Sequence, residues 1–139
     1  LLIMKNKLLF NQNIEDLKSK IGFGIKFWLE FQNDKRKNIL GSGWARLLES
    51  IDNTQKNENK SLTLAAKECG YSYKYAWNII KRIENRTNMA PVETSKGGRG
   101  GGGWVKLNKW GRYLLKTYRN LLIELKEIEK KLEKSFKID

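Results

Sequence analysis

The sequence predicts a mainly α-helical fold with a small β part, and three observations support this class. Two short helical patterns are separated by a glycine within residues 63–88. A glycine-rich stretch lies between two extended segments within residues 91–107. A long helical pattern then begins at Asn108. A chain of 139 residues is long enough for one domain with a hydrophobic core and one long helix.

The N-terminal part is predicted to hold one short helix and two strands. Asn13 can cap a helix over residues 13–21, whose first turn is acidic and whose last turn is basic. Within residues 25–31, large apolar side chains recur at every second position, which is the period of a half-buried strand. Residues 33–37 form a polar turn, and residues 38–40 are predicted to return as a second strand.

The middle of the chain is predicted to hold three helices. Ser42 can cap the first, which carries apolar residues at helical spacing, namely Trp44, Leu47, Leu48 and Ile51. A polar loop is expected over residues 53–60. Two further helices are expected over about residues 63–69 and 72–88, and Pro91 lies beyond the end of the second.

The second and third of these helices have the features of a helix-turn-helix unit. Gly70 suits the tight turn because glycine readily adopts a positive φ, and Ser72 is a good N-cap for the second helix. Small or apolar side chains fall on the inner faces of the pair; these are Ala65, Cys69, Ala76 and Ile79. Such a unit presents its second helix to the major groove of DNA. An ordinary helical hairpin with a solvated basic face is the alternative.

The second helix of the pair carries the candidate DNA-contacting side chains. These are types that hydrogen-bond to base edges or phosphates. The candidates are Ser72, Tyr73, Lys74, Tyr75, Asn78, Lys81 and Arg82. The orientations of Tyr75 and Trp77 are ambiguous, and for Trp77 packing against the domain is the preferred interpretation. Cys69 is expected to be a small core residue rather than a reactive thiol.

The glycine-rich stretch over residues 96–103 predicts the tip of a β-hairpin wing. Lys96 and Arg99 can lie along the phosphate backbone, and a bare backbone such as that of Gly100 can approach phosphate oxygens closely. The spelling Gly-x-Gly-x-x-Gly also occurs here, but a strand-like segment follows where a dinucleotide site requires a helix. No nucleotide cofactor is therefore expected. A flexible linker is the alternative for this stretch.

The positive charge of the chain is concentrated in its middle. The sequence holds 28 Lys and Arg against 15 Asp and Glu, a formal net charge of +13. Residues 71–119 hold 11 Lys or Arg against two acidic residues, whereas residues 120–139 hold five of each sign. A concentrated basic patch attracts polyanions through Coulomb forces and counterion release. A merely soluble basic surface is the alternative.

Composition argues against several other classes of protein. The chain has no histidine, which removes the commonest general base and zinc ligand, and its carboxylates form no catalytic motif. We therefore expect no enzyme, no metal and no cofactor. Its single cysteine fits a reducing cytoplasm, and no apolar run is long enough to span a membrane. The sequence starts at Leu1, and whether Met4 is the true start or the chain is a fragment stays open.

Several of these residues occur in an order that resembles a known family. They are Ala65-Ala66-Lys67, Gly70, Ser72-Tyr73-Lys74, Ala76-Trp77, Gly97-Gly98-Arg99-Gly100 through Gly103, and Leu107 with Gly111. Over about residues 25–125 the chain is similar to the N-terminal DNA-binding domain of the molybdate-responsive regulator (ModE) family, itself related to LysR-type winged-helix domains. The resemblance implies a dimeric transcription factor with a winged helix-turn-helix.

The resemblance also bears on the effector. Full members of that family carry a C-terminal molybdate-binding region of small β-barrels, whereas the printed chain stops at Asp139. The resemblance therefore supports DNA binding, and no molybdate or other oxyanion effector is expected in this chain. A standalone version and a fragment are both compatible with this pattern.

The last predicted helix carries a seam for a partner helix. Apolar residues alternate in steps of four and three, namely Leu114, Tyr118, Leu121, Leu125, Ile128 and Leu132. We expect a homodimer whose recognition helices bind half-sites about 34 Å apart, one DNA turn. A single amphipathic helix packed on its own domain is the alternative.

These predictions combine into one organisation and one function. We expect an N-terminal helical extension (1–22), a winged helix-turn-helix DNA-binding domain (23–107) and a long dimerisation helix (108–139). The expected function is that of a sequence-specific regulator of transcription that binds double-stranded DNA as a homodimer. The alternatives are a non-specific architectural protein that binds DNA or RNA, and a winged-helix module that binds other proteins.

Overall fold

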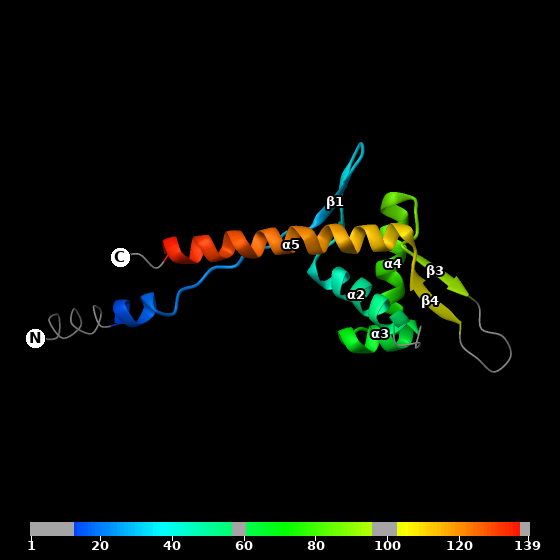
Figure 1. The fold of residues 1–139 in the computed structure, drawn as a ribbon, viewed down its shortest axis with the longest axis horizontal. Helices are drawn as coiled ribbons and strands as arrows, with labels where there is room; N and C mark the ends of the chain where they lie inside the picture. The colour runs from blue at the N-terminus through cyan, green and yellow to red at the C-terminus, as the bar shows by residue number, and fades with distance from the viewer. Residues whose placement is uncertain (1–12, 57–60, 96–102, 137–139) are drawn as a thin grey trace, which may run out of the picture.

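The computed structural model describes residues 13–56, 61–95 and 103–136. After helical residues 13–18 come β1 (Leu29–Gln32), β2 (Arg36–Leu40), α2 (Ser42–Lys56), α3 (Leu62–Cys69), α4 (Tyr73–Thr87), β3 (Val92–Ser95), β4 (Trp104–Leu107) and α5 (Lys109–Phe136). Two antiparallel hairpins, β1–β2 and β3–β4, accompany the helices (Figure 1). The predicted class is confirmed: a mainly α winged-helix fold with a long last helix. Within the described ranges, no helix combines the length and apolar character that a membrane crossing requires.

The alternating segment near the N-terminus is a strand only at its end. We predicted a strand from residue 25, but β1 begins at Leu29 because its partner β2 spans only five residues. The upstream residues pack differently. The ring of Phe27 stacks on Tyr118 of α5, with ring centroids 4.6 Å apart. The apolar alternation therefore serves contacts with a helix as well as strand pairing.

Helix α2 differs from its prediction at both ends. Ser42 is its first residue rather than its cap, because Gly41 supplies the carbonyl that accepts from the Ala45 amide at 2.8 Å. The helix also continues to Lys56, through part of the predicted loop. Thr54 is buried there, and its hydroxyl donates to the Ile51 carbonyl at 2.9 Å. That bond satisfies a polar side chain that looked like a loop residue in the sequence.

The helix-turn-helix prediction is confirmed in detail. Gly70 has a φ of 72° and ends α3. The amides of Gly70 and Tyr71 donate to the carbonyls of Lys67 and Ala66 at 3.0 and 2.9 Å. These two hydrogen bonds are the pair that defines a Schellman cap. The Ser72 hydroxyl accepts from the Tyr75 amide at 3.0 Å and starts α4. The four predicted inner-face residues, Ala65, Cys69, Ala76 and Ile79, are all buried.

The wing consists of β3 and β4. Val92 pairs with Leu107 at its base and Ser95 with Trp104 toward its tip. Lys106 lies 3.5 Å from the Glu93 carboxylate on the facing strand, and its ammonium is 5.0 Å from the centre of the Trp104 ring. The predicted tip residues Lys96, Arg99 and Gly100 lie outside the described residues.

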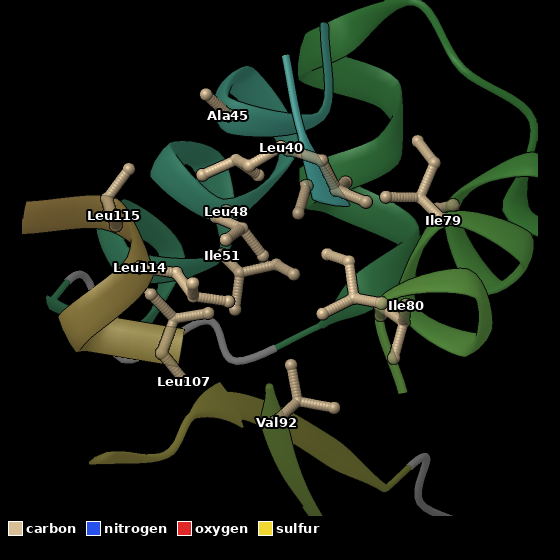
Figure 2. Close-up of a cluster of buried hydrophobic side chains, with 14 of the residues drawn as sticks. Leu40, Ala45, Leu48, Ile51, Ile79, Ile80, Val92, Leu107, Leu114 and Leu115 are labelled. Atoms are coloured by element: carbon tan, nitrogen blue, oxygen red, sulfur yellow. The ribbon is translucent and has the colours of Figure 1, made fainter. Parts of the chain in front are cut away.

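One hydrophobic core joins α2, α3, α4, both hairpins and the start of α5. Figure 2 shows side chains of α2, α4, β3, β4 and α5 converging, with Leu48, Ile51 and Ile80 among them. The Arg119 guanidinium holds α5 against α2, because its Nε donates to Glu49 at 2.8 Å and it also lies 3.8 Å from Asp52. The first turns of α5 therefore belong to the same hydrophobic core as α2, although the sequence analysis placed the whole helix in a separate dimerisation part.

The junction between the wing and α5 is unusually close. The side-chain oxygen of Asn108 caps α5 by accepting from the backbone amide of Gly111 at 2.9 Å. The backbone amide of Asn108 donates to the Pro91 carbonyl at 3.1 Å. A Cβ on Gly111 would lie 2.1 Å from that same carbonyl oxygen. Only glycine fits this position, and this gives Gly111 a physical role that the sequence pattern left unexplained.

Candidate nucleic-acid interface

Helix α4 has one face in the core and one in solvent. Its inner face is formed by Ala76, Ile79, Ile80 and Ile83, each at most 2% exposed. The candidate residues all lie on the outer side and are exposed; these are Ser72, Tyr73, Lys74, Tyr75, Asn78, Lys81 and Arg82. The outer side of α4 is therefore not buried in the protein's interior, and it is accessible to a groove of DNA.

The outer side of α4 divides into a central stripe and two flanks. At 3.6 residues per turn, Lys74, Asn78 and Lys81 lie above one another in the stripe. Asn85 continues that stripe and is exposed. Our sequence analysis did not include Asn85, although its spacing of seven residues from Asn78 was a usable signal. Tyr75 and Arg82 lie on one flank, and the second flank faces the wing.

The cations of α4 carry uncompensated charge. Within the described part of the chain, no carboxylate forms an ion pair with Lys74, Lys81 or Arg82. Arg86 differs, because its guanidinium donates to the Asn38 carbonyl and lies 5.6 Å from the centre of the Trp44 ring. One arginine of α4 thus braces the helix, while its neighbour Arg82 stays exposed.

Aromatic pairs brace the N-terminal end of α4. Tyr75 meets Tyr71 edge to face at 4.9 Å, and Tyr73 meets Trp77 at 6.3 Å. The Tyr71 hydroxyl donates to the Gly43 carbonyl at 3.0 Å. Burial raises the pKa of the Tyr71 phenol above its ordinary value. Trp77 is half-buried against the core, in line with the packing role predicted for it.

The wing lies beside the second flank of α4. A shallow cavity of about 390 Å³ joins them, and its lining includes Thr63 of α3, Tyr73 and Trp77 of α4, and Thr94 and Trp104 of the wing. Figure 1 shows the wing strands and α4 at the same end of the molecule. Helix and wing therefore present one continuous surface, with hydroxyl and aromatic groups between them.

The predicted dimerisation seam divides into two parts. Leu114 and Tyr118 are buried in the core of their own domain, at 2% and 7% exposure. Further along the helix, Leu125 is half-buried and the other three, Leu121, Ile128 and Leu132, are exposed. The second part lies on the half of α5 that projects from the core (Figure 1). Only this part offers an uncovered apolar face.

Several known proteins are similar to part of this chain. No protein-family model matches the chain. The chain is 37% identical over 67 residues to the DNA-binding transcriptional dual regulator ModE of Escherichia coli, which is 48% of this chain and 25% of that protein. It is 43% identical over 61 residues to the molybdenum transport protein ModE of Herbaspirillum seropedicae, 44% of this chain and 22% of that protein. This chain carries a ModE-like N-terminal domain. The resemblance seen in the sequence is thereby confirmed.

The ModE-like domain is also similar to a protein with a different name. It is 31% identical over 100 residues to the molybdenum-pterin-binding protein MopB of Rhodobacter capsulatus, which is 72% of this chain and 35% of that protein. The matched region spans about a quarter to a third of the length of these curated relatives. The ModE-like domain therefore corresponds to one part of longer proteins.

Proposed function

We propose that the ModE-like domain is a transcriptional regulator that binds specific sequences of double-stranded DNA. The observation that carries this proposal is the unpaired basic stripe on the outer face of α4, beside the wing. The relatives support it, because ModE of Escherichia coli is named a DNA-binding transcriptional regulator. None of this requires catalysis by the domain.

The proposed mechanism inserts α4 into the major groove, whose width of about 12 Å admits a helix. Asn78 and Lys74 read base edges, because asparagine pairs with adenine and lysine with guanine. Lys81, Arg82 and the N-terminal residues Ser72, Tyr73 and Tyr75 contact the flanking backbone. The wing follows the phosphates, and Lys96, Arg99 and Gly100, which lie between β3 and β4 in the sequence, supply contacts to them. Asn85 extends the reading stripe.

Footprinting on genomic DNA tests this function. Sequence-specific binding is expected to leave discrete protected sites, and affinity is expected to fall steeply with salt because phosphate contacts release counterions. Single-stranded DNA and RNA serve as competitors. A uniform cleavage ladder, or stronger competition by single strands, would contradict the proposal and favour an architectural role. Salt-insensitive behaviour with no affinity for polyanions would favour a module that binds other proteins.

We further propose a homodimer held by the projecting half of α5. Leu121, Leu125, Ile128 and Leu132 keep the four-and-three spacing of a coiled-coil seam. In this arrangement residues 1–22 are an extension, residues 23–107 bind DNA, and residues 108–139 dimerise, with the first turns of α5 shared between the last two parts. Two recognition helices are then expected about 34 Å apart.

The dimer proposal predicts a matched pair of variants. Ile128→Lys with Leu132→Lys is expected to weaken dimerisation about 100-fold, because it removes apolar burial from both partners. Ile123 is 62% exposed but lies off the seam. Ile123→Lys is therefore the control and is expected to leave the dimer intact. Sedimentation equilibrium of the full chain measures both. A monomeric wild type, or equal loss in the control, would contradict the proposal.

A further inference from the structure

A second cavity lies on the flank of α4 that faces away from the wing. It has a volume of about 580 Å³, within the range of small-molecule pockets. Four separate parts of the chain line it: residues 25–28, the end of β2 with the start of α2, one flank of α4, and the middle of α5. Sequence analysis did not predict this cavity, because these parts lie far apart along the chain.

The charge of this cavity is strongly positive. Lys26, Arg82, Arg86 and Lys126 line it, against one carboxylate, Glu129. In the portion of the chain that the structure describes, none of these five groups forms an ion pair. Four cations against one carboxylate leave the cavity with a net positive charge, so an anion bound among them would relieve the repulsion between the cations.

About half of the residues that line the cavity are aromatic or aliphatic. Trp28, Trp44 and Tyr118 come from three separate parts of the chain, and Leu122 lies in the lining with them. Trp28 is 48% exposed, and its indole N–H donates to the Glu30 carboxylate at 2.9 Å. Flat side chains of this kind cover flat apolar ligands well. The combination of apolar walls with a few charged groups is typical of pockets for organic ligands.

Arg86 is already positioned for such a ligand. Its guanidinium lies over the Trp44 ring and donates to the Asn38 carbonyl. A guanidinium has five N–H donors, so this bond leaves others for a carboxylate. Arg82, one turn earlier on the same flank of α4, is exposed and lines the same cavity.

We propose that this cavity binds a small organic anion, in which a carboxylate meets Arg82 and Arg86 and a flat apolar ring lies against Trp28 and Trp44. The space exceeds what one inorganic oxyanion would fill, and the apolar walls would leave such an ion poorly hydrated. The ligand would also couple to DNA, because Tyr75 and Arg82 belong both to the cavity and to the proposed DNA-binding face. That coupling rests on the proposed function, whereas the binding itself does not.

The binding step is tested on the full chain with 2-naphthoate, a flat ring with one carboxylate, and with neutral 2-naphthylmethanol as the control ligand. Amide and indole NMR shifts report the position. The naphthoate is expected to move the indole signals of Trp28 and Trp44 and the amides around Arg82. The neutral alcohol is expected to bind at least about tenfold more weakly, because it lacks the charge-assisted hydrogen bonds.

Two variants and two matched controls locate the charge. Arg82→Gln and Lys126→Gln are each expected to weaken naphthoate binding about tenfold. Lys81→Gln and Lys116→Gln remove the same charge from exposed positions of the same helices outside the cavity. Both controls are expected to leave the affinity for naphthoate unchanged. Equal loss in variants and controls, or equal binding of acid and alcohol, would overturn the proposal.

The remaining outcomes also decide. Shifts confined to Leu121, Ile128 and Leu132 would overturn the proposal, because they would place the ligand on the projecting half of α5. NMR signals of cavity residues that change with protein concentration but not with naphthoate would indicate that a second copy of the chain occupies the cavity. This result would also overturn the proposal. A DNA arm is read separately: naphthoate is expected to weaken DNA binding in the wild type and not in Arg82→Gln. Anion binding without any DNA binding would contradict the proposed function alone.

Discussion

Replacing Gly111 by alanine is expected to destabilise the domain by about 3 kcal/mol and to lower its Tm by roughly 10 °C. The added Cβ would lie 2.1 Å from the Pro91 carbonyl oxygen and 3.2 Å from a methyl group of Leu107. The carbonyl cannot simply move, because it accepts the Asn108 amide that starts α5. Relief of the overlap would therefore break the junction between α5 and the wing.

The sign of this effect makes the test decisive. Alanine is favoured over glycine inside a helix by about 1 kcal/mol, so helix propensity alone predicts that Gly111→Ala is stabilising. Urea and thermal unfolding followed by circular dichroism measure the difference. Gly24→Ala is the control, because no atom lies within 4 Å of a Cβ there. A Gly111→Ala protein as stable as the wild type would refute the close approach.

The second large effect concerns DNA recognition. The double variant Lys74→Ala, Asn78→Ala is expected to lose about 2–6 kcal/mol of discrimination between specific and random DNA, since each base contact contributes about 1–3 kcal/mol. This corresponds to a loss of at least about 30-fold in the specificity ratio. Both side chains are exposed, so stability is expected to change little. Titration of both DNAs at one fixed salt concentration measures the ratio.

Variants of the backbone-contacting residues provide the contrast. Arg82→Ala and Arg99→Ala are each expected to weaken binding to all sequences alike and to reduce the salt slope by about one. Retained discrimination in the Lys74 and Asn78 double variant would contradict a reading role for α4. A sequence-dependent loss in Arg99→Ala would contradict the phosphate role of the wing tip.

Residues of the same type have different roles in this domain. Arg82 and Arg86 are separated by one helical turn, so helical spacing places them on the same flank, and the sequence analysis selected only Arg82 as a candidate DNA contact. In the fold, Arg86 meets Trp44 of α2 and the Asn38 carbonyl of β2, whereas Arg82 meets neither. The partners of Arg86, Trp44 and Asn38, lie 42 and 48 positions away along the chain. Helical spacing could therefore predict which flank carries both arginines, but not which one is exposed.

Sequence alone determined the features that local interactions control. The turn at Gly70 and the caps at Ser72 and Asn108 depend on hydrogen bonds between residues at most five positions apart. Short stretches of the sequence are therefore sufficient to predict them. The order of helices and the pairing of the wing strands followed from the same local patterns. Resemblance to the ModE family was also visible at this level, because a short ordered motif carries it.

Tertiary structure decided the features that depend on contacts between side chains far apart in the sequence. The apolar stripe of the last helix is continuous in sequence, yet its first two residues fill the core and its later ones face solvent, because α5 extends beyond the helices that cover it. The strand period near Phe27 turned out to serve an aromatic stack, and the need for Gly111 arose from the path of Pro91. The cationic cavity likewise exists only because four distant segments meet. Long-range packing selects among the contacts that local patterns allow, and a single sequence does not specify which of them form.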